Sequence, residues 1–221
     1  MSSKIKVLFL SLLMIFSSTI FVPNAHAANI VTKKADGSIH VKADAEHLRI
    51  LNELIGTDIT YKELMKRVFP EFISSSSPET LKAMDQPLSE IKRNKIKNNV
   101  QQNSSTSAKA STASGGLIIT SVGSATSKGS GYVMHHSLTT TTAVVPNIAT
   151  SSMLYNSTTG LYVNVEIEEG SYVNANGAAG SYTSPVTGNK YLTYGYHTVI
   201  YPPGYIIPSA TYYSTSNTIT Y

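Results

Sequence analysis

Apolar and polar positions alternate most clearly over residues 161–167, where Leu161 and Val163 begin a face of aliphatic side chains. A period of two is the pattern of a half-buried β-strand. Residues 153–155 predict a partner strand, because residues 156–160 supply a turn that ends in a glycine able to take a positive φ. The pattern therefore predicts an antiparallel hairpin.

Residues 116–221 continue this pattern, since β-branched and aromatic residues are separated by short clusters of Gly, Asn and Pro. The Asn-Gly pair at 176–177 predicts a second hairpin turn, and residues 185–189 predict a third. Residues 201–205 contain two prolines, which lack the donor that a central strand needs, so we expect a loop or an edge there. The segment 116–221 is predicted to form an antiparallel β-sandwich, with a barrel as the alternative.

The segment 28–97 has a helical pattern. A short hairpin is expected around residues 35–37, and a first helix over 45–55, with Asp44 as its N-cap and Gly56 as its stop. These features predict a small region of one hairpin followed by helices. Helices of this length are marginal in isolation and must pack on each other or on the β domain.

Two further helices are expected in the same segment. One begins near Thr60, with Glu63 at capping-box spacing, and is limited by Pro70. The other begins at Ser77, and a last helical turn or two is expected over 88–96.

The segment 28–97 is either an accessory subdomain or a pro-segment removed after export. Residues 98–115 are mostly Ser, Asn, Gln, Thr, Ala and Gly and predict a linker.

Residues 1–27 predict a secretory signal peptide. Lys4 and Lys6 precede an apolar run, and an Ala-His-Ala cleavage pattern ends at Ala27. We therefore expect a secreted, extracellular protein, held at the cell surface at most loosely. The chain has no cysteine, so disulfides cannot stabilise it.

The reactive side chains in the sequence point away from catalysis. Residues 116–221 contain no Asp and no Arg, and no thiol nucleophile is available. The candidate acids and bases are listed here: Glu166, Glu168, Glu169, His135, His136 and His197. A charged strand end explains the acids, and adjacent histidines on a strand point to opposite faces. We therefore predict no catalytic residue, no metal site and no cofactor.

Tyrosine is the stronger clue to function, because thirteen of the fourteen tyrosines lie after residue 116. Tyrosine is favoured at recognition surfaces, although the rings can equally build a core that lacks tryptophan. Five of them crowd around the Pro202-Pro203-Gly204 loop and are the predicted binding residues: Tyr191, Tyr194, Tyr196, Tyr201 and Tyr205.

These observations favour a secreted, non-enzymatic module that binds an extracellular or cell-envelope partner, either a protein or a glycan. The alternative is a membrane-active toxin or antimicrobial protein, because Ser/Thr-rich segments such as 139–145 could form amphipathic hairpins. A secreted hydrolase is the third choice. Nucleic acid is not expected as a partner. The net charge of +4 includes two lysines of the predicted signal peptide, and the remaining Lys and Arg residues form no basic stripe.

Overall fold

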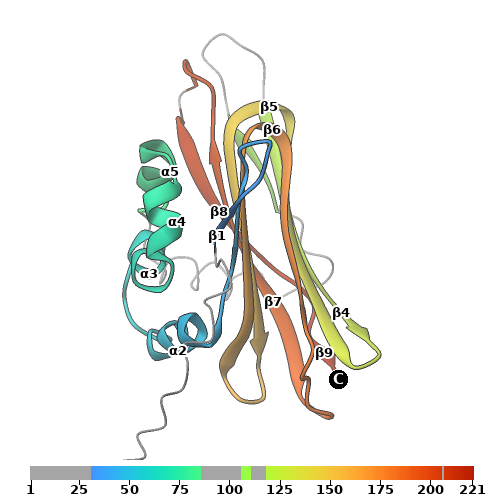
Figure 1. The fold of residues 1–221 in the computed structure, drawn as a ribbon. Coiled ribbons are helices and arrows are strands. Elements are labelled where there is room, and N and C mark those ends of the chain that lie inside the picture. The colour runs from blue at the N-terminus through green and yellow to red at the C-terminus, as the bar shows by residue number, and fades with distance from the viewer. Residues whose placement is uncertain (1–30, 86–105, 111–117, 206) are drawn as a thin grey trace, which may run out of the picture.

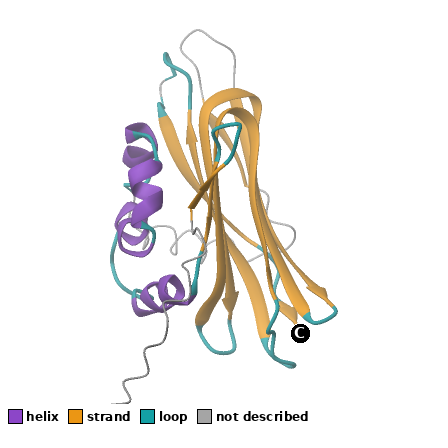
Figure 2. Ribbon diagram, viewed as in Figure 1, coloured by secondary structure: helices purple, strands orange, loops and turns teal. Residues whose placement is uncertain are grey.

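The computed structural model describes residues 31–85, 106–110, 118–205 and 207–221. The signal peptide predicted at 1–27 and the helical turns predicted over 88–96 lie outside these ranges. In the described parts the chain is mainly β, and all nine strands belong to one antiparallel sheet with four short helices beside it (Figures 1 and 2). The mainly β, antiparallel character is therefore confirmed. The finer prediction of a sandwich stays a prediction, because one continuous sheet holds all nine strands.

The elements follow the chain in a simple order. The strands are β1 (Val31–Lys33), β2 (Ile39–Lys42), β3 (Thr106–Ala110), β4 (Ile118–Gly129), β5 (Tyr132–Asn156), β6 (Leu161–Tyr182), β7 (Lys190–Ile200), β8 (Ser209–Thr215) and β9 (Ile219–Thr220). The helices are α2 (Ala45–Glu53), α3 (Tyr61–Val68), α4 (Pro70–Ser75) and α5 (Pro78–Ala83).

The long β5–β6 hairpin organises the sheet. The first half of β5 lies between β4 and the second half of β6, whereas its second half lies between the first half of β6 and β7. The two halves are separated by a shift in pairing between Thr140 and Val145. The sheet bends at this point, which is the upper end of the molecule in Figure 1.

The bend brings the two halves of the hairpin into contact through polar side chains. Thr139 Oγ1 lies 2.7 Å from Thr150 Oγ1, although both residues belong to β5. Ser124 of β4 similarly contacts Ser214 of β8, with 2.5 Å between their hydroxyl oxygens. The space between the two halves is thus lined in part by buried Ser, Thr and His side chains that bond to one another. Buried polar groups are tolerated where such partners exist.

The largest apolar cluster lies on the other face of the second half, beneath the helices, whereas two smaller apolar clusters lie between the two halves of the hairpin. Side chains of α3 and α4 pack in the largest cluster against Val41, Val165 and Ile167. Asn52 of α2 also bonds to the backbone of Tyr162, accepting from its N–H at 2.7 Å and donating to its carbonyl at 3.0 Å. The helices, which lie on one side of the sheet in Figure 2, are therefore packed parts of the same fold. None of the helices in the described ranges reaches the length and apolar character needed to cross a bilayer.

The N-caps of three helices were predicted correctly. Asp44, Thr60 and Ser77 each cap a helix, and their side chains accept backbone N–H bonds from the first turn. Pro70 does end α3, but it also begins α4, a helix that the sequence analysis did not predict. Proline suits the first helical position, where its missing N–H has no helical partner.

Within residues 116–221, the turn predictions held in three places and failed in one. Residues 157–160 form the turn between β5 and β6, with Gly160 at φ 76°. Residues 183–189 join β6 to β7. Residues 201–205 lie in the connection between β7 and β8 and belong to neither strand. The prediction of a hairpin turn at Asn176-Gly177 is wrong. Asn176 pairs with Thr139 inside β6, and its side chain donates to the Ile148 and Glu168 carbonyls. These tertiary bonds outweigh the local preference for a turn.

Two strand details also differ from prediction. The pairing shifts between Leu154 and Tyr155, so Val163 packs in a different apolar cluster from Val165 and does not share one continuous face with it. Within the predicted linker, residues 106–110 form β3, which pairs with β4. The sequence of β3 has no large apolar residue, so periodicity could not reveal it.

Candidate functional site

The predicted binding tyrosines do not gather on one exposed surface. Tyr191, Tyr196 and Tyr201 are buried, each in a different apolar cluster. Tyr194 and Tyr205 are half-buried. Tyr201 and Tyr205 do meet, with stacked rings 5.9 Å apart. A binding role for the set stays a prediction, whereas three of the five rings are placed as core.

A larger group of tyrosines packs on the helix-covered face of the sheet. Tyr194 contacts Tyr155, Tyr162 and Tyr213, with ring centroids 5.6 to 6.1 Å apart. Tyr61 of α3 joins this group by stacking on Tyr196. Burial raises the pKa of Tyr162 and Tyr213, so these hydroxyls stay protonated at ordinary pH. The group therefore builds a core without tryptophan.

The three histidines of the β-rich half have separate environments. His197 is enclosed, with Nδ1 2.8 Å from Thr139 Oγ1 and Nε2 2.7 Å from Ser214 Oγ, and burial lowers its pKa to about 3. His135 contacts Ser152 through Nδ1, and burial lowers its pKa to about 4. His136 is exposed on the opposite face, as strand alternation requires. Within the described ranges, no group of three His, Asp or Glu side chains is arranged to hold a metal ion.

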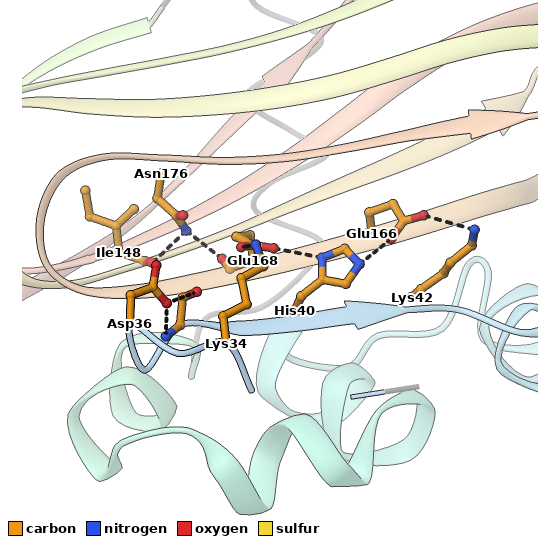
Figure 3. A network of polar contacts seen from close by, with 9 residues as sticks. Lys34, Asp36, His40, Lys42, Ile148, Glu166, Glu168 and Asn176 are labelled. Carbon is orange, nitrogen blue, oxygen red and sulfur yellow. Dashed lines mark hydrogen bonds and ion pairs between the residues drawn. The ribbon is translucent and has the colours of Figure 1, made fainter. Parts of the chain in front are cut away.

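The three glutamates are divided between two faces of β6. Glu166 and Glu168 share a polar network with β1–β2 residues, shown in Figure 3. His40 bridges them, with Nδ1 2.7 Å from Glu168 Oε2 and Nε2 3.3 Å from Glu166 Oε2. Glu169 lies on the other face, where it accepts a bond from Asn147 Nδ2 at 2.8 Å. The sequence did not reveal that His40 joins the acids, because β2 lies more than a hundred residues away.

Glu166 can hold a proton near neutral pH, but the contacts of the network serve to hold two parts of the fold together. Burial raises the pKa of Glu166 to about 7, although His40 and Lys42 oppose that shift. Lys34 forms an ion pair with Glu168, and Lys42 Nζ lies 3.9 Å from Glu166 Oε1. Each cation comes from β2 or the residue after β1, and each acid from β6. The pairs therefore tie the β1–β2 hairpin to β6, which is a sufficient account of the network.

A groove on the outer face of the first half of the hairpin is the best candidate for binding. It is a shallow, open depression of about 420 Å³ that is lined by Tyr132, Met134, Ala179, Gly180, Ser181 and Thr183. A tyrosine ring and a methionine supply apolar contact, and Ser181 and Thr183 supply hydroxyls. No lining residue carries a charge.

The geometry of the strands explains how the groove forms. Met134 of β5 is paired with Ser181 of β6, so a large side chain stands beside a small one on the same face. Tyr132 lies across Gly129 of β4, where an added Cβ would be 2.2 Å from the ring atom Cζ. Gly129 therefore allows the ring to lie close to the neighbouring strand.

The groove was not evident from the sequence. Tyr132, Met134 and Leu138 alternate with Val133, His135 and Ser137 along β5, and that alternation was visible in the sequence. The structure turns Tyr132, Met134 and Leu138 outward with His136, and it buries the polar His135 and Ser137 with Val133, which differs from the usual apolar-inward arrangement. Periodicity alone cannot tell which face is buried.

Comparison with known proteins adds no assignment: no family model, no curated protein and no solved structure matches this chain.

Proposed function

We propose that this protein is a secreted module that binds an extracellular or cell-envelope glycan without transforming it, through the groove beside Tyr132. The folded-over sheet acts as a sandwich-like scaffold, and its outer face makes the contact. The observation that carries the proposal is a neutral groove that combines a tyrosine ring with hydroxyl groups.

The groove chemistry suits a sugar. One face of a pyranose ring carries C–H groups that pack on an aromatic ring, and its edge carries hydroxyls that need hydrogen-bond partners. Tyr132 and Met134 supply the apolar contact, and Ser181 and Thr183 supply the polar one. Because no lining residue is charged, an uncharged glycan is the expected class.

Among the described residues, His136, which is paired with Ala179, is the one histidine or acid on the outer face beside the groove, and the acid and second histidine close to Gly180 are shielded from it. Glu166 and His135 lie behind the strand that floors the groove, where an added Cβ on Gly180 would be 2.6 Å from His135 Nε2 and 2.7 Å from Glu166 Cγ. Both side chains are buried on the inner face. A bound sugar on the outer face would thus be separated from them by the β6 backbone.

Retention on insoluble chitin, cellulose and peptidoglycan tests the proposal, using wild type and Tyr132→Ala. We expect wild type to be retained on at least one polymer, and Tyr132→Ala to bind about tenfold more weakly, since a lost ring contact costs about 1.4 kcal/mol. Ala179→Phe, which fills the groove at an exposed position, should also weaken binding.

Tyr172→Ala is the matched control, because Tyr172 is exposed but lies at the bend of the hairpin, away from the groove. It should bind like wild type. Equal retention of wild type and Tyr132→Ala, or no retention of wild type on any of the three polymers, would rule out the groove as a glycan site.

A further inference from the structure

The bend of the β5–β6 hairpin lies at one end of the molecule (Figure 1). Apolar side chains there are exposed to solvent. Tyr172 is 79% exposed and Val144 is 56% exposed. Ile207, in the β7–β8 connection, is 45% exposed. We call these three residues the apolar tip.

The apolar tip stands on a packed base. Val145 and Val173, which neighbour Val144 and Tyr172 in sequence, pack in one cluster with Tyr201. Tyr201 begins the connection that carries Ile207, and its N–H donates to the carbonyl of Pro208, the residue after Ile207, at 2.9 Å, so the cluster supports both parts of the tip. The exposed residues therefore project from a packed apolar cluster.

Tyr172 has an unusual backbone. Its φ is 54°, and it is the one non-glycine residue with positive φ in the described ranges. A bulky side chain in this region costs on the order of 1–3 kcal/mol, and such outliers concentrate at functional sites. The strained residue carries an aromatic ring that lies in solvent and makes little contribution to the core.

The strand segments at the tip carry no charge, because residues 140–150, 170–182 and 198–211 include no Asp, Glu, Lys or Arg. Exposed charges of both signs lie on neighbouring elements: Lys33 in β1, and Glu79 and Lys82 in α5, which contacts β7 and β8. The β1–β2 turn also approaches this end in Figure 1, but its Lys34 is paired with Glu168, and its Asp36 accepts bonds from Ser38. Attraction to a strongly charged partner is therefore not built into this end.

We propose that the apolar tip attaches the protein to the surface of a phospholipid bilayer without crossing it. Tyrosine favours the membrane–water boundary, where its ring is apolar and its hydroxyl stays hydrated. Val144 and Ile207 can enter the acyl boundary beside it. An uncharged, aromatic and aliphatic tip fits a zwitterionic lipid surface, and this attachment is independent of the glycan groove.

Flotation with phosphatidylcholine vesicles tests this proposal on the full mature chain. We expect wild type to float with the vesicles and to do so equally in high salt. The double variant Val144→Ser/Tyr172→Ser should show at least tenfold weaker partitioning. Leu161→Ser is the matched control, because Leu161 is 44% exposed at the opposite end of the same hairpin. It should float like wild type.

A second variant separates attachment from folding. Tyr172→Gly removes the ring but relieves the backbone strain, so it should unfold at a higher temperature than wild type and still bind vesicles more weakly. The proposal is overturned if wild type stays unbound, if the double variant floats equally, or if binding requires anionic lipid and disappears in salt. It is also overturned if the tip variants abolish self-association and leave flotation unchanged, because the tip would then bind a second copy.

Discussion

Tyr61 of α3 stacks on Tyr196 of β7, with ring centroids 4.6 Å apart and an angle of 8° between the planes. The Tyr61 hydroxyl also contacts Ser151 Oγ at 2.6 Å, and the residue is buried. This pair joins the helical segment to the centre of the sheet. The two regions that the sequence distinguished therefore share one core.

Tyr61→Ala should be among the most destabilising single changes, because it removes a buried ring and leaves a cavity between α3 and β7. Truncation of a buried aromatic residue costs about 3–5 kcal/mol. Tyr61→Phe keeps the ring and loses only the hydroxyl contact, so it should cost about 1 kcal/mol. Denaturant unfolding of both variants checks this. Similar losses in the two variants would show that the ring stack is not the main contribution.

Removal of the helices should leave the sheet poorly folded. A chain of residues 118–221 would expose Met153, Val165 and Ile167, which now pack beneath α3 and α4. We expect low soluble yield or a loss of near-UV circular dichroism, relative to a chain that begins at Ala28. An unfolding midpoint equal to that of the longer chain would contradict the shared core. The outcome also bears on the predicted pro-segment, whose removal in vivo would require the remaining sheet to be stable.

Gly195→Ala should destabilise the polar interior. An added Cβ would lie 2.4 Å from Ser124 Oγ and 2.5 Å from Ser214 Oγ, so the hydroxyl contacts there would have to separate. We expect a cost of about 1–3 kcal/mol, as for other overpacked interiors. Gly123→Ala is the control, because an added Cβ there meets nothing within 4 Å. Thermal unfolding should distinguish the two, and equal midpoints would argue against tight packing at Gly195.

Acid should destabilise the fold through its buried histidines. The pKa values of His197 and His135 are lowered by burial to about 3 and about 4, from an ordinary value of 6.5. Their contribution to stability is complete above pH 6.5 and is lost as the pH falls through the folded values. We therefore expect wild type to lose more stability than His197→Gln between pH 6.5 and pH 4; the comparison is needed because Glu166, whose pKa is raised, changes the free energy of unfolding in the opposite direction. An equal loss in the two proteins would show that the His197 ring is not buried in neutral form.

Glu166 should have the opposite pH dependence. Burial raises its pKa from 4.5 to about 7, so its contribution is complete below pH 4.5 and is lost as the pH rises through 7. Glu166→Gln removes this effect. The stability of that variant relative to wild type should therefore rise between pH 4.5 and pH 8, by on the order of 3 kcal/mol at about 1.4 kcal/mol for each pKa unit. Denaturant unfolding at both pH values measures it. A constant difference between variant and wild type would mean that Glu166 titrates normally.

Features that depend on neighbouring residues could be read from the sequence. The caps at Asp44, Thr60 and Ser77 were predicted because a side chain and the backbone two or three residues later form the whole interaction. The turn at Gly160 was predicted for the same reason. The β-rich character of residues 118–221 followed from composition and alternation, which are also local properties.

Features that depend on distant partners could not. Asn176-Gly177 stayed inside β6 because Asn176 bonds to Ile148 and Glu168, and no local rule includes those bonds. The alternation along β5 fixed two faces but not which one faces solvent. That was decided when the bend placed His135 against Ser152 and left Tyr132 and Met134 outside. The sequence by itself thus determined the helix caps and the strand-forming half. Only the tertiary structure decided the groove, the apolar tip and the contacts of His40 with Glu166 and Glu168, because each depends on segments far apart in the chain.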